Sequence, residues 1–337
     1  MEEHYSNPPL MSTYKHLFVD HHRHRLDIGA VECDLPVIDL AGLLDDGESS
    51  AQLCRADIVR AASEWGFFQV TNHGVPQALL RELHDAQVAL FRRPFQQKVT
   101  ERLLDFSPES YRWGTPTATC LEQLSWSEAY HIPMTPATAG SMSRCIRAVI
   151  EEVSTAMYEL AQKLAAVLTR GLGGGEAMMT REETCFLRLN RYPPCAMGGA
   201  FGLCPHTDSD FLTILHQQDT IGGFQLLKGG RWVAVKPNPS TLIVNVGDLL
   251  QAWSNDMYKS VEHRVMANAT LERFSMAFFL CPSYDTLIPS HECECDDHGK
   301  YRSFTFGEYR RQIMEDVRST GRKIGLHRFL RRSSTAL

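Results

Sequence analysis

The sequence has no long apolar run. Its 337 residues include no stretch of about eighteen consecutive apolar residues, the length that a helix needs to cross a bilayer. The first thirty residues are polar and rich in histidine, where a secretory signal would need an apolar centre. We therefore expect a cytoplasmic protein without a membrane partner.

Positive charge is also in short supply. The chain has 34 Lys and Arg against 40 Asp and Glu, and its formal net charge is -6. The basic residues are dispersed rather than gathered into one stripe, which argues against nucleic acid as a partner. An oligomer is compatible with the sequence, but no feature of it indicates one.

Cysteine is present, but not as a disulfide framework. The ten cysteines are scattered through a chain with 43% hydrophobic residues, enough for a large core, so we interpret them as reduced thiols. Cys293 and Cys295, flanked by His291 and His298, have one residue between them, whereas structural zinc sites usually have two or more. We interpret this segment as a solvated loop. An intermolecular disulfide formed by an exposed cysteine of this pair is the alternative.

The chain divides into four regions with no repeat or low-complexity linker between them. Residues 1–34 show no periodicity and are expected to be a solvated, partly ordered leader; a metal or anion site in the His and Arg run at 21–25 is the weaker interpretation. Residues 35–180 are expected to pack on the core as helices and short strands. Residues 181–300 are expected to form that core, and 301–337 a C-terminal helix and tail.

Two amphipathic helices are predicted in the second region. One follows Pro76, where Leu79, Leu80, Leu83, Ala86, Leu90 and Phe91 recur at helical spacing. A longer apolar stripe runs from Ile146 to Leu168 and should end at Gly171. We expect both stripes to be core.

The third region has the texture of short strands. The predicted strands are 184–189, 211–216, 223–227, 231–236, 241–246, 260–266 and 273–280. Lys228-Gly229-Gly230 between two of them is typical of a hairpin turn. Short strands at regular spacing without intervening helices favour an antiparallel sandwich or barrel, of which the jelly roll is one form.

Two histidines and an aspartate form a candidate metal site in this region. His206 and Asp208 stand two apart, which on a strand points both side chains to one face. In the strand around His263, the residues Val261, His263 and Val265 should share the inward face. Two imidazoles and one carboxylate leave three octahedral positions of a metal open, as non-haem iron(II) oxygenases require.

The next strand offers a second pair of polar side chains. Arg273 and Ser275 are again two apart and should face inward, while Phe274 and Met276 face away. The planar guanidinium matches a carboxylate, and the hydroxyl adds a donor. Taken alone, Arg273 would be a surface ion pair and each histidine a core residue; the shared inward register favours a site.

The pattern His-x-Asp, a gap of 54 residues, His, then Arg-x-Ser resembles the plant 2-oxoglutarate and Fe(II) dependent dioxygenases. The resemblance extends to Leu-Pro-Val-Ile-Asp at 35–39, Trp-Gly-Phe-Phe at 65–68 and Asn-Arg-Tyr-Pro-Pro at 190–194, so it covers nearly the whole chain. It implies a double-stranded β-helix, a distorted jelly roll, flanked by helices.

The resemblance also implies roles for single residues. His206, Asp208 and His263 match the iron ligands. Arg273 and Ser275 match the residues that bind the distal carboxylate of 2-oxoglutarate. The implied cofactors are Fe(II), 2-oxoglutarate and O2, with ascorbate as reductant.

Two further residues belong to the same cosubstrate site. Tyr192 matches a hydroxyl that meets the 2-oxoglutarate carboxylate, and Asn190 is assigned to this site with it. Along the strand, Phe186, Arg188, Asn190 and Tyr192 would share one face.

The segment Cys120–Pro133, with Tyr-Arg-Trp-Gly at 111–114, resembles gibberellin 2-oxidases, and among them the group acting on twenty-carbon gibberellins. This implies 2-beta-hydroxylation of a small-molecule gibberellin, which inactivates the hormone or its precursors. Substrate candidates are Arg188, Phe279 and Tyr130; the alternatives are an exposed ion pair for Arg188 and plain core for Phe279. Other functions that stay open are oxidation at another gibberellin position or of another plant metabolite, and a jelly-roll binding protein without catalysis.

Overall fold

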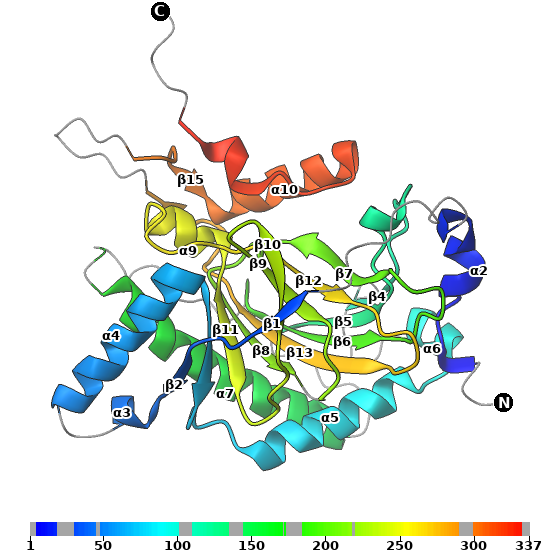
Figure 1. Cartoon of the computed structure of the whole chain (residues 1–337), viewed down its shortest axis with the longest axis horizontal. Coiled ribbons are helices and arrows are strands. Elements are labelled where there is room, and N and C mark those ends of the chain that lie inside the picture. The colour runs from blue at the N-terminus through cyan, green and yellow to red at the C-terminus, as the bar shows by residue number, and fades with distance from the viewer. Residues whose placement is uncertain are drawn as a thin grey trace, which may run out of the picture.

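Two β-sheets form the centre of the protein, and the helices cover them. The computed structural model describes residues 5–18, 30–44, 48–100, 110–134, 144–170, 172, 184–217, 220–289 and 299–331. None of the helices in these ranges is long and apolar enough to cross a membrane. The expected mainly β architecture with flanking helices and a jelly-roll core is confirmed (Figure 1).

The larger sheet has eight strands. Their order is β2 (Val37–Asp39), β3 (Phe67–Thr71), β11 (Leu242–Val246), β8 (Leu212–Gln217), β13 (Arg273–Leu280), β6 (Phe186–Tyr192), β5 (Glu128–Pro133) and β4 (Tyr111–Trp113). Most pairs are antiparallel, and β2 pairs with β3 in parallel.

The smaller sheet has five strands. Their order is β1 (Val31–Cys33), β10 (Arg231–Val235), β9 (Phe224–Lys228), β12 (His263–Met266) and β7 (Phe201–His206). β9 and β10 are joined by the expected hairpin, in which Gly229 and Gly230 have φ angles of 57° and 76°. A third sheet pairs β14 (Leu287–Ile288) with β15 (Phe304–Thr305).

Strand alternation decides what each face of the large sheet meets. On β13, Phe274, Met276 and Phe278 join the core shared with the helices, whereas Arg273 and Ser275 point to the opposite face. That opposite face meets the small sheet across a second apolar cluster, which includes Leu215, Phe224, Leu226, Ile243 and Val265. The site therefore lies between the two sheets.

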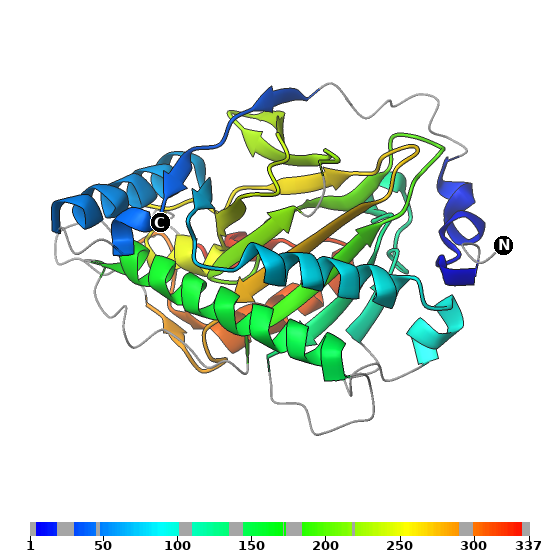
Figure 2. The ribbon, with the colours of Figure 1, turned by 90° about the horizontal axis from the view of Figure 1, so that it is seen from below.

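Long helices cover the outer face of the large sheet. α5 (Gln77–Phe91) and α7 (Arg144–Thr169) run side by side across it (Figure 2), and α4 (Glu48–Trp65) packs beside α7. Their apolar stripes are buried as expected, for example Leu83 on α5 and Met157 on α7. Shorter helical elements are α3 (Ala41–Leu44), α6 (Phe95–Thr100), η5 (Leu121–Gln123) and α9 (Asp248–Trp253).

The N-terminal segment is more buried than expected. Residues 10–18 form α2 (Leu10–Tyr14) and η1 (Lys15–Phe18), and Leu10, Tyr14 and Phe18 are buried. Order in part of the leader agrees with the expectation, but these three residues are not solvated, because they pack in one apolar cluster with Trp126 and its neighbours. The run at 21–25 lies outside the described residues, as do Cys293 and Cys295.

The C-terminal segment lies on the other side of the strands from α5 and α7 (Figure 1). α10 (Phe306–Thr320) begins at Thr305, whose hydroxyl accepts a hydrogen bond from the backbone N–H of Glu308. Gly321 caps its C-terminus with a φ of 74°, a left-handed conformation that glycine adopts without strain. The chain then forms η7 (Gly325–Phe329). This segment closes one wall of the site.

Candidate active site

A cavity of about 480 Å³ lies between the sheets. Residues of β6, β8, β12 and β13 line it, and Arg310, Ile313 and Val317 of α10 complete its wall. All sequence-predicted metal and cosubstrate residues line this cavity.

Three candidate metal ligands converge in the wall of the cavity. His206 at the end of β7 and His263 at the start of β12 are cross-strand partners. One ligand atom each from His206, Asp208 and His263 lies within 4.8 Å of the others. Asp208 Oδ1 is 3.6 Å from His206 Nε2 and 3.7 Å from His263 Nε2.

The local structure that positions Asp208 differs from the expectation. β7 ends at His206, and Asp208 belongs to the turn that follows, so the two side chains do not share a strand face. The backbone carbonyl of Asp208 instead accepts a hydrogen bond of 2.9 Å from the N–H of Asp248 at the start of α9. A turn fixed by the helix start, rather than the strand pleat, orients this carboxylate.

Hydrogen bonds around the three side chains orient them for a metal. The Nδ1 atoms of His206 and His263 lie 2.8 and 3.1 Å from the carbonyl oxygens of Cys204 and Val261, which leaves both Nε2 atoms facing the centre. Asp208 Oδ2 accepts hydrogen bonds from Thr213 and Asn245, so Oδ1 faces the histidines. Imidazoles held by carbonyls and a carboxylate held by donors are the usual surroundings of a metal site. The donor set fits Fe(II).

The electrostatics of these groups suits a cation. Burial, and after it His263, lowers the pKa of His206 to about 3, so the imidazole is neutral at neutral pH. Burial opposes ionisation of Asp208, but the two histidines and its hydrogen bonds lower the pKa of this carboxyl to about 2. A neutral imidazole at His206 and an ionised carboxylate at Asp208 are the protonation states that a metal requires of these ligands.

The cosubstrate candidates lie together on two paired strands. Arg273 and Ser275 on β13 stand opposite Tyr192 and Asn190 on β6. All four are buried, and the Arg273 guanidinium lies 5.1 Å from the centre of the Tyr192 ring. Ser275 Oγ donates to the Tyr192 hydroxyl at 3.5 Å, and Arg273 donates to Gln217 at 3.1 Å. This cluster fits one carboxylate of a dicarboxylic acid whose other end reaches the metal.

Two of the three substrate candidates line the cavity. Arg188 points into it from β6, and Phe279 stacks on Phe186 with ring centroids 4.4 Å apart. Tyr130 lies elsewhere, and that expectation is corrected. It is 2% exposed and packs against Phe91 and Tyr111 on the helix side of the sheet, because alternation along β5 turns its neighbour His131 into the cavity.

Several cavity residues were not predicted from the sequence. Arg112 and His131 lie within the segments that resemble gibberellin 2-oxidases, which was a usable signal. Arg310 and Lys323 come from the C-terminal segment, where helical periodicity gives no indication that one face meets the site.

Comparisons with known proteins agree with this site. Residues 183–282 match the 2OG-Fe(II) oxygenase superfamily. Residues 35–147 match the family described as non-haem dioxygenase in morphine synthesis N-terminal. The first match contains all the candidate metal and cosubstrate residues.

Individual relatives are similar over nearly their whole length. Gibberellin 2-beta-dioxygenase 5 of Oryza sativa subsp. japonica is 79% identical over 343 residues, covering 98% of this chain and 99% of the relative. Gibberellin 2-beta-dioxygenase 8 of Arabidopsis thaliana is 50% identical over 303 residues, covering 89% and 88%. Among solved structures, JOX2 in complex with 2OG, Fe and JA matches with a TM-score of 0.74 at 32% identity, covering 90% and 91%.

Proposed function

The chain belongs to the 2OG-Fe(II) oxygenase superfamily and, within it, to the gibberellin 2-beta-dioxygenases, and from this premise we propose the reaction and the residues that serve it. The enzyme adds a hydroxyl group to carbon 2 of a gibberellin, on the β face, and so inactivates the hormone. Its cofactors are Fe(II), 2-oxoglutarate and O2. Twenty-carbon precursors as substrates, ascorbate as reductant and a cytoplasmic location are the finer parts of the proposal.

The observation that carries the proposal is the identity of 79% to gibberellin 2-beta-dioxygenase 5 along almost the entire chain. The convergence of His206, Asp208 and His263 within 4.8 Å supports catalysis rather than mere binding, since such a site keeps positions open for reactants.

We assign the iron to His206 Nε2, His263 Nε2 and Asp208 Oδ1. When bound with 2-oxoglutarate and O2, the iron supplies an oxidant able to remove hydrogen from an unactivated carbon. The protein contributes the rest: carbonyl oxygens hold the two imidazole rings, and Asn245 and Thr213 hold the carboxylate. These contacts fix the ligand atoms, and with them the directions of the open coordination positions of the iron, before the reactants bind.

We assign the distal carboxylate of 2-oxoglutarate to Arg273, Ser275 and Tyr192, with Asn190 beside them. The guanidinium offers two parallel donors, and the two hydroxyl groups complete the shell of a buried carboxylate. Both side chains are shielded from bulk solvent, because Arg273 and Ser275 are 2% and 1% exposed. Each hydrogen bond is stronger in such surroundings than in water.

The outer part of the cavity holds the gibberellin. The stacked rings of Phe186 and Phe279 offer an apolar wall to the rigid hydrocarbon skeleton. Arg188 offers a cation to a carboxylate of the substrate. A rigid substrate held at both kinds of contact presents one C–H bond to the iron, so one product should dominate.

Substitution of the metal ligands tests the residue assignments. His263→Ala and Asp208→Ala should each lose bound iron and gibberellin-dependent succinate formation while keeping the far-UV circular dichroism of the wild type. His327→Ala, at an exposed position of η7, is the matched control and should keep both. Full iron content and turnover in His263→Ala would show that this residue is not a ligand.

A further inference from the structure

A glutamine interrupts the apolar stripe of α5. Gln87 stands one turn after Leu83 and one turn before Phe91, on the helix face that packs against the large sheet. Its side chain is fully buried, with 0% exposure. The amide nitrogen donates to the backbone carbonyl oxygens of Asn190 at 2.8 Å and Ser275 at 3.1 Å. A carbonyl oxygen can only accept, so these two contacts determine that the nitrogen of the amide faces the sheet.

The amide oxygen of Gln87 carries a cost that packing alone does not explain. This atom is buried and has no hydrogen-bond partner among the described residues. A methionine here would continue the apolar stripe with a side chain of similar length and would leave no oxygen unpaired. The two donated hydrogen bonds are therefore the feature that distinguishes glutamine from an apolar residue at this position.

The two acceptors belong to the strands that carry the cosubstrate candidates. Asn190 on β6 is the cross-strand partner of Ser275 on β13, and Gln87 bridges the pair from the helix side. On the opposite face of the same strands, the side chains of Asn190, Tyr192, Arg273 and Ser275 line the cavity. A carboxylate bound by groups from two strands needs those strands at a fixed spacing, because hydrogen bonds weaken steeply away from their preferred direction.

α5, which crosses the outer face of the large sheet (Figure 2), holds β13 at further points. The ring of Phe274, the middle residue of the Arg-x-Ser motif, has its centre 5.6 Å from that of the His84 ring and 6.2 Å from that of the Phe91 ring. His84 and Phe91 stand one turn before and one turn after Gln87. Three successive turns of the helix therefore contact the short segment of β13 that carries the motif.

We infer that Gln87 is a positioning residue for 2-oxoglutarate. By bonding the carbonyl oxygens of Asn190 and Ser275, it fixes how β6 and β13 lie against each other and against α5. The directions of the groups that bind the distal carboxylate follow from that arrangement. Gln87 is not among the residues that line the cavity, so it acts only through the two strands. The inference rests on the proposed function, which assigns 2-oxoglutarate to these strands.

Equilibrium binding of 2-oxoglutarate tests this role without relying on turnover. The affinity is measured by calorimetry on the Co²⁺-loaded protein with oxygen excluded. Gln87→Met removes both donors and should weaken 2-oxoglutarate binding by roughly 3- to 10-fold, about the effect of one lost hydrogen bond. The affinity for Co²⁺ should stay unchanged. Gln87→Glu, which places an oxygen where the donor stood, should weaken 2-oxoglutarate binding at least as much.

Leu79→Ala separates positioning from stability. It shortens a partly buried side chain two turns earlier on the same helix, and it should lower the stability while binding 2-oxoglutarate as the wild type does. Urea unfolding of both variants gives the comparison. If Gln87 only stabilised the fold, the loss of affinity would follow the loss of stability in both Leu79→Ala and Gln87→Met.

A double-mutant cycle tests whether Gln87 acts through Ser275. In a Ser275→Ala background, Gln87→Met should weaken 2-oxoglutarate binding less than in the wild type, because one of the groups that it positions is missing. Wild-type affinity in Gln87→Met, an equal loss in Leu79→Ala, or full additivity in the cycle would overturn the inference. Failure of the wild type itself to bind 2-oxoglutarate would instead overturn the cosubstrate assignment of the proposed function.

Discussion

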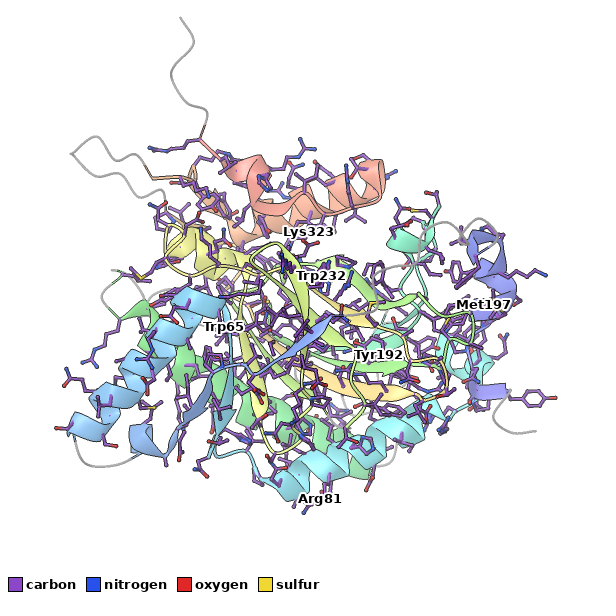
Figure 3. All side chains as sticks on the ribbon, in the orientation of Figure 1. Trp65, Arg81, Tyr192, Met197, Trp232 and Lys323 are labelled. Atoms are coloured by element: carbon purple, nitrogen blue, oxygen red, sulfur yellow. The ribbon has the colours of Figure 1, made fainter. Side chains whose placement is uncertain are left out.

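Lys323 holds Thr207, the residue between the candidate ligands His206 and Asp208. Its ammonium group donates to the carbonyl oxygen of Thr207 at 2.8 Å and to the hydroxyl oxygen at 2.9 Å. Figure 3 shows Lys323 where the C-terminal segment meets the strands. The same ammonium pairs with Asp248, so the C-terminal segment and the metal-binding turn share one polar cluster.

Lys323→Met should therefore loosen the metal-binding turn. We expect the affinity for Fe(II) to fall by about 10- to 100-fold, as for other residues that support metal ligands, with more succinate formed per hydroxylated product. Titration with Co²⁺ and product ratios measure the two effects. Lys163→Met, at an exposed position of α7, is the control, and an unchanged metal affinity in Lys323→Met would contradict this role.

Arg273→Lys should raise the concentration of 2-oxoglutarate needed for half-maximal rate far more than that of the gibberellin. Lysine keeps the charge but loses the planar pair of donors, and a charge-assisted hydrogen bond to a buried carboxylate is worth roughly 1.5 to 3 kcal/mol, or about 10- to 100-fold. Steady-state titration of each substrate separates the effects. The same 2-oxoglutarate titration in variant and wild type would refute the assignment.

Lys98→Met should destabilise the protein without changing a residue that lines the cavity. The side chains of Lys98 and Glu128 are both fully buried, with an ion pair of 2.5 Å, and Lys98 also donates to the carbonyl oxygens of Ser6 and Phe91. Breaking a buried ion pair costs about 3 to 5 kcal/mol when the remaining charge has no other partner, and Glu128 keeps Arg191 as a partner, so we expect a loss below that range. Urea unfolding measures the loss; a change no greater than that of Lys163→Met would contradict the prediction.

His131 should make stability depend on pH. Its pKa is about 4 in the folded protein, against an ordinary value of about 6.5 in the unfolded chain. Between these values the unfolded chain binds more protons, so stability should fall as the pH is lowered through this window. His131→Phe should flatten that part of the profile. Melting temperatures at pH 7 and pH 5 check this, and parallel profiles would contradict it.

The sequence was most informative where regular strands carry the site. Alternation along β13 correctly predicted that Arg273 and Ser275 face the interior between the sheets and that Phe274 and Met276 face the helices. A buried strand has two faces of different chemistry, so a two-residue period settles the direction of each side chain once one of them is known. The apolar stripe of α5 was predictable for the same kind of reason.

The sequence was less informative where tertiary contacts determine the direction of a side chain. Asp208 is oriented by a turn after its strand, and a spacing of two residues cannot distinguish that turn from a strand. Tyr130 was chosen as a substrate candidate from a resemblance that does not say which face of β5 it occupies, and it lies on the helix side, whereas His131 lines the cavity. Arg310 reaches the cavity only because α10 folds back over the strands, a long-range packing event that leaves no local pattern.

The position of the new oxygen tests the central claim most directly. The purified protein is incubated with Fe(II), 2-oxoglutarate, ascorbate and oxygen and with matched twenty-carbon and nineteen-carbon gibberellins, and the products are located by mass spectrometry and NMR. The account predicts one dominant product hydroxylated at carbon 2 on the β face, with succinate formed in step. Oxidation at carbon 3 or carbon 20, or no gibberellin turnover by iron-loaded enzyme, would contradict it.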